Sequence, residues 1–300
     1  MHLNETLASL RFSYLCHRMP GLKWIGKNMP RAWLFKWTQW GAGISIFLYA
    51  ADRRRARHMR QAIAKHIAAE QIPGLIKKNL AHRKWVRNLV YAWPNWRGRY
   101  HEWVRFEGEE NLAAALQGNG GAILLSGHAY GYSRMVAPVL AQRGYRVYRM
   151  GRGQRPDQAS RWGGEIASIQ WQYINYGENY WQHVSALQKI RKALRANGVI
   201  HFSVKGFSHG DPALEIDFFY GGFFLDPALL EIIGILQAPV LPCFAVCDEE
   251  GRLVVTIYPA MGSSRKEIMD GFGPLYSTYL KERPEFSQIW RRVVLKQDGW

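Results

Sequence analysis

The sequence contains little cysteine. Its three cysteines in 300 residues, Cys16, Cys243 and Cys247, are too few for the disulfide framework of a small secreted protein. Cys243 and Cys247 lie in an apolar, strand-like run without the further Cys/His pair that a zinc site needs, so we interpret them as core residues. The first 20 residues lack the continuous apolar core of a signal peptide. These absences favour a reducing, cytoplasmic setting and predict no metal site.

Two common catalytic motifs are also absent. Ser126 stands in Leu-Leu-Ser-Gly-His rather than in the Gly-x-Ser-x-Gly sequence of a nucleophile elbow. The glycines at 118–121 are not followed by the Gly-Lys-Ser/Thr of a phosphate-binding P-loop. We therefore expect neither a hydrolase built on such an elbow nor a P-loop nucleotide-binding protein.

Acidic residues are scarce relative to basic ones. The 23 Asp and Glu stand against 40 Lys and Arg, which gives a net charge of +17. Such a charge attracts polyanions, among them nucleic acids, anionic lipid surfaces and phosphorylated substrates. We recognise no basic–aromatic nucleic-acid-binding module, so nucleic acid is not an expected partner. Aromatic residues are abundant, with 13 Trp and 15 Tyr, which suits both a protein core and a membrane interface.

Residues 33–51 are the most membrane-like stretch of the chain. Their uninterrupted apolar part, after Gln39, is shorter than the roughly 20 residues that a spanning helix needs. Aromatic residues stand at the start of the stretch, and the basic cluster 52–60 follows it directly. This order predicts a helix that lies in, or dips into, an anionic membrane interface. The alternative is a buried core helix followed by a solvated basic helix.

From about residue 100 the pattern changes to alternating strands and helices. The strand 122–126, the helix 133–144 and the strand 145–150 form a parallel strand–helix–strand unit. Little alternation along these strands indicates a sheet that is covered on both faces. The helix 184–198, which we expect to stop at Gly198, precedes another strand.

Further along, Asp226 and Pro227 are typical of a helix start, and two antiparallel strands follow. We therefore predict an α/β fold with a mixed, mainly parallel central sheet flanked by helices. Its expected organisation is an N-terminal helical, membrane-associating region at 1–100 and one α/β domain at 101–300.

The best candidate for chemistry is His128, which follows the buried strand 122–126 and Gly127. Ligands of open parallel sheets bind beyond the carboxyl ends of the strands. A neutral imidazole there can take a proton from a hydroxyl as the hydroxyl attacks an acyl carbonyl. Gly127 and Gly131 would allow substrate to approach the backbone closely. The alternative is a histidine that only hydrogen-bonds a neighbouring loop.

Three arginines are expected at the end of the second parallel strand, where Arg149 stands, and directly after it, where Arg152 and Arg155 stand. Arginine binds phosphate oxygens through two parallel hydrogen bonds, so these residues are candidates for holding a phosphate group of a ligand. For Arg152 and Arg155 a solvated loop is an equally good interpretation.

The stretch "EGEENLAAALQGNGGAILLSGH" (107–128) resembles the approach to the active site in the lysophospholipid acyltransferase superfamily, most nearly in its lipid A late (lauroyl/myristoyl) acyltransferase branch. Three further segments are similar to that family in the same order, over residues 80–292. They are "YRVYR" with Arg149, "IDFFYGGFFLDPALLEIIGILQAPVLPCF" (216–244) and "RPEFSQIWRR" (283–292).

The resemblance implies a glycerolipid acyltransferase-like fold. It also implies transfer of a fatty acyl group from acyl carrier protein or acyl-CoA to a lipid-like acceptor, as in the biosynthesis of lipid A and lipopolysaccharide. His128 would be the general base, and Arg149, with Arg152, would bind phosphate. No metal or bound cofactor is implied. The expected place of action is the cytoplasmic face of the inner membrane, reached peripherally or through a single N-terminal anchor.

The sequence departs from the family at the acid of its His-x4-Asp/Glu motif, where Ser133 stands. Lys205 stands near a second position that is commonly acidic in this branch. Three accounts remain open. Glu165 or Asp211 could supply the carboxylate from elsewhere in the chain. His128 could act with a weaker partner on an easier reaction, such as transfer to an amine. The protein could instead be a non-catalytic relative that binds lipid or acyl chains at the membrane.

Overall fold

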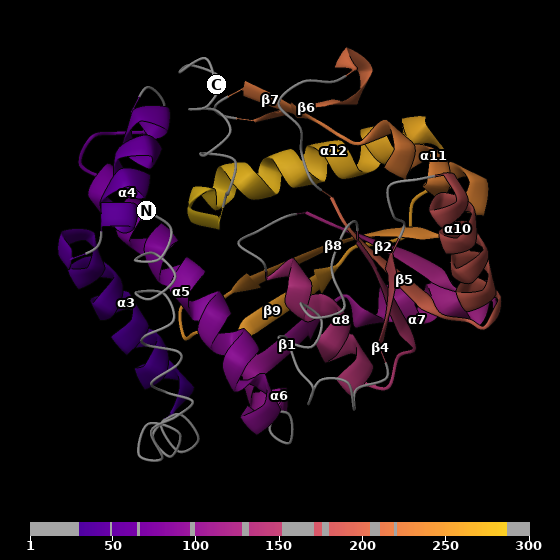
Figure 1. Ribbon diagram of the computed structural model, residues 1–300, viewed down its shortest axis with the longest axis horizontal. Helices are drawn as coiled ribbons and strands as arrows, with labels where there is room; N and C mark the ends of the chain where they lie inside the picture. Colours follow the sequence, from indigo (N-terminus) through magenta and orange to yellow (C-terminus); the bar gives the residue numbers. More distant parts are fainter. Residues whose placement is uncertain are drawn as a thin grey trace.

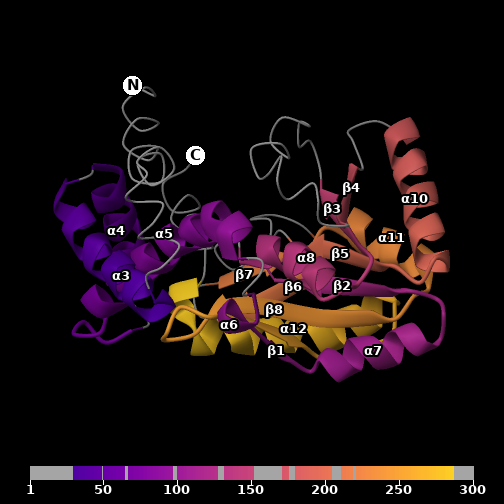
Figure 2. The same cartoon turned by 90° about the horizontal axis from the view of Figure 1, so that it is seen from below.

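The computed structural model describes residues 30–48, 50–64, 67–96, 100–127, 132–151, 171–175, 180–204, 211–218 and 221–286. A seven-stranded sheet crosses the molecule, with helices on both of its faces (Figures 1 and 2). The sheet is mixed and mainly parallel, so the predicted α/β fold class is confirmed.

The order of the strands puts β2 at the centre of the sheet. From one edge to the other, the strands are β1 (Val104–Glu107), β9 (Leu253–Ile257), β8 (Val240–Cys247), β2 (Ala122–Ser126), β5 (Val199–Ser203), β3 (Val147–Gly151) and β4 (Trp171–Asn175). Every neighbouring pair is parallel except the β8–β9 hairpin. All residues of β2 and β8 are buried, which explains their continuous apolar sequences.

Helices connect and cover these strands. They are α6 (Tyr100–Trp103), α7 (Glu109–Gln117), α8 (Ser133–Gln142), α10 (Tyr180–Arg195), α11 (Pro227–Leu236) and α12 (Arg265–Glu282), with the short 3₁₀ helices η3 (Pro212–Leu214) and η4 (Pro284–Phe286). Asp226 caps α11 through the backbone N–H of Ala228, as its sequence predicts. The predicted stop of α10 at Gly198 is wrong by one residue, because Asn197 adopts the left-handed conformation after the helix.

The two faces of the sheet carry different layers. Side chains alternate along a strand, so Ser126, His201 and Ser203 point to the face on which α8 packs. Phe244 points to the opposite face, where it stacks on Tyr276 of α12. Figure 2 shows α8 and α12 on opposite sides of the sheet.

The chain leaves neighbouring strands toward different faces. After β2 it continues into α8. After β5 it leads to a small hairpin, β6 (Glu215–Phe218) and β7 (Gly221–Phe224), and Ile216 of that hairpin lies against Gly273 of α12. A divergence of this kind opens a crevice beyond the carboxyl ends of the strands, where ligands of open α/β sheets bind.

Three N-terminal helices pack beside the sheet: α3 (Arg31–Leu48), α4 (Ala50–Ile63) and α5 (Ile72–Trp96). Phe35 of α3 packs on Trp85 of α5, and the indole N–H of Trp85 donates to the carbonyl of Gly251 at the β8–β9 turn. The buried residues of these helices and of the sheet therefore form one continuous core. None of the helices in the described ranges is both long enough and apolar enough to cross a membrane.

Candidate functional site

The strand β2 ends at the candidate site, and Gly127 follows it directly. A Cβ atom placed on Gly127 would lie 2.3 Å from Cε2 of Tyr276, a separation at which something must move. The end of β2 therefore lies in close contact with the ring of Tyr276, which belongs to α12 on the opposite face of the sheet. This contact requires a glycine at position 127 whether or not a substrate approaches the backbone there.

Several of the predicted site residues lie outside the described residues. They are His128, Gly131, Arg152, Arg155, Glu165 and Lys205. Their roles stay predictions, and the site is built here from the residues around them.

Ser133, which the sequence resemblance predicts to stand at the acid position, is the first residue of α8 and is fully buried. Its Oγ lies 3.2 Å from the Oγ of Ser203, the last residue of β5, and either hydroxyl can donate. The partner of Ser133 is thus a second neutral hydroxyl. The pair ties the start of α8 to the carboxyl end of β5 without bringing a negative charge.

A second contact connects the start of α8 to the N-terminal helix α5. Tyr132, directly before the helix, is fully buried, and its hydroxyl lies 3.1 Å from Nδ1 of His82 on α5. Burial, with a contribution from Lys78, lowers the pKa of His82 to about 3, so this ring is neutral at physiological pH. The helix start that follows residues 128–131 is therefore positioned by both β5 and α5.

His201 is a buried histidine that sequence reasoning did not single out. Its Nε2 lies 2.8 Å from Oγ of Ser126, the last residue of β2, and that hydroxyl donates to the carbonyl of Phe202. Because the hydroxyl proton goes to Phe202, the ring proton is assigned to Nε2, which donates to Ser126. The signal for this residue is a single polar position inside the apolar strand "VIHFS".

The surroundings of His201 hold it neutral. Burial, and then the positive charge of Arg149, lower its pKa to about 3. Its Nδ1 is buried without a hydrogen-bond partner among the described residues. A neutral ring thus connects β5 to the last residue before Gly127, and it cannot serve as a cation in the site.

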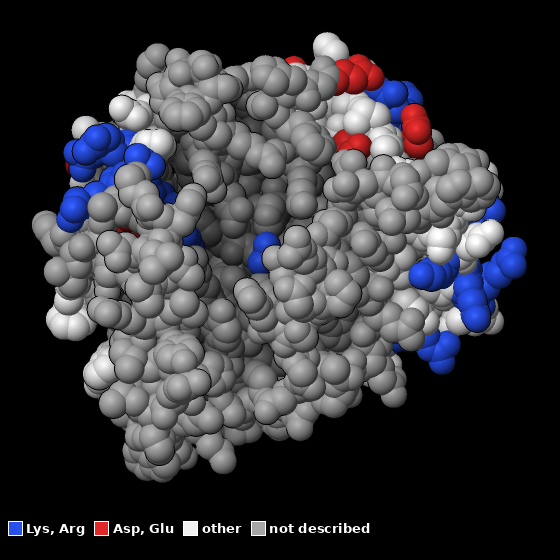
Figure 3. Space-filling model, in the orientation of Figure 1, with Lys and Arg blue, Asp and Glu red and all other residues white. Residues whose placement is uncertain are grey.

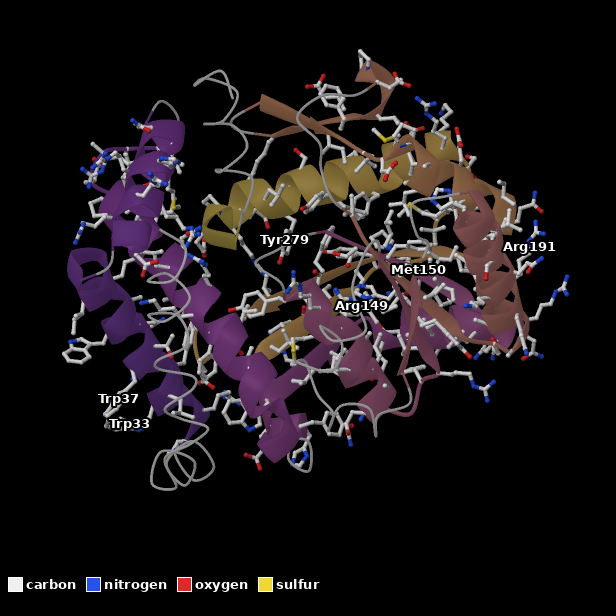
Figure 4. All side chains as sticks on the ribbon, viewed as in Figure 1. Trp33, Trp37, Arg149, Met150, Arg191 and Tyr279 are labelled. Atoms are coloured by element: carbon white, nitrogen blue, oxygen red, sulfur yellow. The ribbon has the colours of Figure 1, made fainter. Side chains whose placement is uncertain are left out.

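Arg149 lies within β3, paired with His201 of β5, in agreement with the predicted strand 145–150. Its side chain is partly buried on the same face as Ser126. In Figure 4, Arg149 lies near the centre of the view. Figure 3, drawn in the same orientation, shows a basic side chain near the centre of the view. Arg149 therefore lies two residues before the carboxyl end of β3, beside His201 in the middle of β5.

Asp211, a candidate replacement for the missing acid, has other partners. Its side chain accepts a hydrogen bond from the backbone N–H of Ala213 at the start of η3 and forms an ion pair with Arg265 of α12. These interactions hold the pKa of this exposed carboxyl below its usual value. Asp211 therefore stabilises the connection between η3 and α12, and within the described ranges its contacts include neither Ser126 nor Ser133.

Comparison with known proteins identifies the family. A search of curated proteins gives no match. The sequence model of the bacterial lipid A biosynthesis acyltransferases matches residues 18–283, which include the whole β2–α8 site and nearly the entire described fold. The chain therefore belongs to the bacterial lipid A biosynthesis acyltransferase family, as the resemblance of its motifs predicted.

Proposed function

We propose that this protein transfers a fatty acyl group from an acyl thioester to a hydroxyl or amine of a lipid-like acceptor, with His128 as the general base. Family membership supports acyl transfer in general. The observation that carries the assignment is the position of Gly127, at the carboxyl end of the central strand and between α8 and α12. His128 is the next residue in the chain.

The reaction needs one base and no further reactant. His128 takes the proton of the acceptor O–H or N–H while the oxygen or nitrogen attacks the thioester carbonyl. Backbone N–H groups of the turn that begins at Gly127 stabilise the oxyanion of the tetrahedral intermediate. The carbon–sulfur bond then breaks, and the departing thiolate takes the proton back from the imidazolium.

Arg149 is the proposed phosphate-binding residue. Acyl carrier protein carries its thioester on a phosphate-linked arm, coenzyme A contains phosphates, and a lipid acceptor can be phosphorylated. A guanidinium on β3, two residues before the carboxyl end of that strand, can bind such a group through two parallel hydrogen bonds. We expect it to fix the position of the donor or acceptor relative to His128.

The hydroxyl pair of Ser133 and Ser203 limits how strongly the base is activated. A serine can accept a hydrogen bond from an imidazole N–H but cannot stabilise the imidazolium with a full negative charge. A weakly activated base favours an acceptor that attacks with little proton removal by the base, such as an amine. It also favours the second candidate function, a non-catalytic relative that binds lipid or acyl chains at the membrane.

An acyl-transfer assay separates the two. Purified wild type, His128→Ala and Ser133→Ala would be mixed with radiolabelled acyl carrier protein or acyl-CoA and a bacterial total lipid extract. We expect a labelled lipid from the wild type and a rate at least about 100-fold lower from His128→Ala, the usual contribution of a positioned base. The labelled product would name the acceptor.

Ser133→Asp restores the acid of the family motif and serves as the matched variant. If Ser133 contacts His128, the aspartate will raise the apparent pKa of the base in a pH–rate profile, whereas Ser133→Ala will not. A wild type that binds acyl donor but transfers nothing, with either donor, would establish the binding protein instead.

A further inference from the structure

One nitrogen of the His201 ring meets no hydrogen-bond donor in the described part of the chain. Because Nε2 donates to Oγ of Ser126, Nδ1 carries a lone pair and can only accept a hydrogen bond. The ring is fully buried, and Nδ1 has no partner among the described residues. Native structures keep few buried acceptors without a donor, because each one lowers stability. The position of this ring is therefore explained best by a donor that approaches it during function.

Arg149 is placed to supply that donor. It is the residue of β3 that pairs directly with His201 of β5. Neighbouring strands lie about 4.8 Å apart, and paired residues of a parallel ladder point to the same face of the sheet. The positive charge of Arg149 is one of the two causes that lower the pKa of His201, so the charge lies close to the ring. A guanidinium has five N–H donors and no acceptor, which complements a lone pair.

A neutral acceptor suits an arginine that binds phosphate. A carboxylate at position 201 would also hold the guanidinium, but it would neutralise the charge that attracts a phosphate group. The imidazole of His201 is neutral at physiological pH, because burial lowers its pKa to about 3. It can therefore direct the side chain of Arg149 and leave the positive charge of that residue to the ligand.

The ring of His201 is itself fixed in direction. Its N–H donates to Ser126, and the hydroxyl of Ser126 donates in turn to the carbonyl of Phe202. The residues of β5 before and after His201 are buried, so the ring has little room to turn. Rotation of the ring would also break its hydrogen bond to Ser126. The lone pair of Nδ1 therefore keeps one direction, as a group that positions another side chain must.

We propose that His201 is a positioning residue for Arg149: its Nδ1 accepts a hydrogen bond from the guanidinium while other N–H groups of Arg149 bind the phosphate of the acyl donor. The contact tightens when the phosphate is bound, as hydrogen bonds of catalytic sites commonly do. The inference rests on the proposed phosphate-binding role of Arg149. It connects that role to the end of β2, because the same ring holds Ser126, two residues before His128.

The affinities of 4′-phosphopantetheine and of pantetheine measure the contribution of the phosphate alone. The first is the arm that acyl carrier protein and coenzyme A share, and the second is the same molecule without its phosphate. Isothermal titration calorimetry on the full-length protein gives the ratio of the two affinities. Arg149→Gln should reduce this ratio to about one. His201→Leu should lower it by about 10-fold, the contribution of one hydrogen bond to a charged group.

Two further variants separate positioning from a general loosening of β5. His201→Gln is the conservative variant, because its amide can donate to Ser126 and accept from Arg149. It should retain most of the wild-type affinity ratio. Ile200→Ala is the matched control, since Ile200 is the buried neighbour in the strand and points to the opposite face. It should lower the temperature of thermal unfolding and leave the affinity ratio unchanged.

Nitrogen-15 NMR of protein labelled at histidine detects the contact directly. The resonances of His201 can be assigned by their absence in His201→Gln, and they should show the proton on Nε2. Addition of 4′-phosphopantetheine should move the Nδ1 resonance toward that of a hydrogen-bonded nitrogen. The same addition to Arg149→Gln should leave the Nδ1 resonance in place.

The outcomes distinguish this inference from the proposed function. A wild type that binds both compounds equally would contradict the phosphate-binding role of Arg149 and this inference with it. An affinity ratio that Arg149→Gln abolishes and His201→Leu leaves unchanged would overturn the role of His201 alone. So would an Nδ1 shift that persists in Arg149→Gln, because the lone pair would then have another donor, such as a buried water. The expected ratios in a protein that transfers no acyl group would support the inference and contradict only the catalytic proposal.

Discussion

The two faces of the sheet differ most at the end of β2. On the face of α8, Ser126 and His201 are joined by a hydrogen bond, and Ser133 and Ser203 by another. On the face of α12, Phe244 stacks on Tyr276 and Tyr279 at ring-centroid distances of 5.6 and 4.5 Å. One side of the strand is therefore polar and the other is aromatic, although both are buried.

This difference separates two tasks that one strand end performs. The aromatic face holds the backbone of Gly127 in place by contact with Tyr276. The polar face connects β2, β5 and α8 through directional hydrogen bonds between neutral groups. Packing thus fixes the position of Gly127 at the end of β2, and hydrogen bonds fix the positions of β5 and α8 beside it.

The largest effect is expected on the aromatic face. Phe244→Ala removes a buried ring from a cluster that includes Phe272, Tyr276 and Tyr279. It should lower the free energy of unfolding by about 3–5 kcal/mol, measured by urea denaturation. Phe244→Leu retains most of the volume and should cost much less. Similar decreases in the free energy of unfolding from both variants would mean that retaining the side-chain volume at position 244 does not preserve stability.

Gly127→Ala should lower the free energy of unfolding by about 1–3 kcal/mol, because the added methyl group must displace the ring of Tyr276. The double variant Gly127→Ala with Tyr276→Leu should lose less than the sum of the two single variants. The coupling can be measured in a double-mutant cycle by urea denaturation. Strict additivity would show that the ring does not limit position 127.

The polar face should make stability depend on pH. The pKa values of His82 and His201 are both lowered to about 3 from a usual value of 6.5. Between these values the unfolded chain binds a proton that the folded chain does not, so stability falls as the pH falls. The loss should be about 1.4 kcal/mol per pH unit for each histidine. Urea denaturation at pH 7 and at pH 5 would measure it.

The variant His201→Gln isolates the part of the pH dependence of stability that comes from the His201 ring. Glutamine is neutral throughout this range. Between pH 6.5 and pH 5 the free energy of unfolding of the variant should therefore fall by about 2 kcal/mol less than that of the wild type. An equal loss in both proteins would show that His201 titrates normally in the folded state.

The smallest effect is expected at the hydroxyl pair. Ser133→Ala should lower the free energy of unfolding by about 1 kcal/mol, because it leaves the hydroxyl of Ser203 without that partner. Ser203→Ala should lower the free energy of unfolding less in the Ser133→Ala background than in the wild type, because it then leaves no hydroxyl without its partner. If the second replacement costs the same in either background, the two serines do not interact.

Local sequence patterns were sufficient for much of the fold. The apolar runs of β2, β5 and β8 predicted buried strands, and Asp226 with Pro227 predicted the start of α11. The family match confirms the resemblance drawn from the motifs. The stop of α10 was misplaced because asparagine can also adopt the left-handed conformation.

The site was predicted less completely, because its contacts join distant parts of the chain. His201 is 75 residues from Ser126, and Ser203 is 70 residues from Ser133. No local pattern reports that such residues meet, and a polar residue inside an apolar strand is easily dismissed. The predicted strand 145–150 already contained Arg149, but only the pairing between β3 and β5 shows that Arg149 lies beside His201.

Residue types and their spacing were enough to predict the class of the fold and the family, and they set the aromatic and basic composition of residues 33–60. Only the tertiary structure decided which of these residues meet and which face outward. It placed Ser133 against Ser203, engaged Asp211 with Arg265, and directed the tryptophans of α3 away from the core. The physical reason is that packing of β5, α5 and α12 around β2 sets the partners and burial of each side chain, and no one segment contains that information.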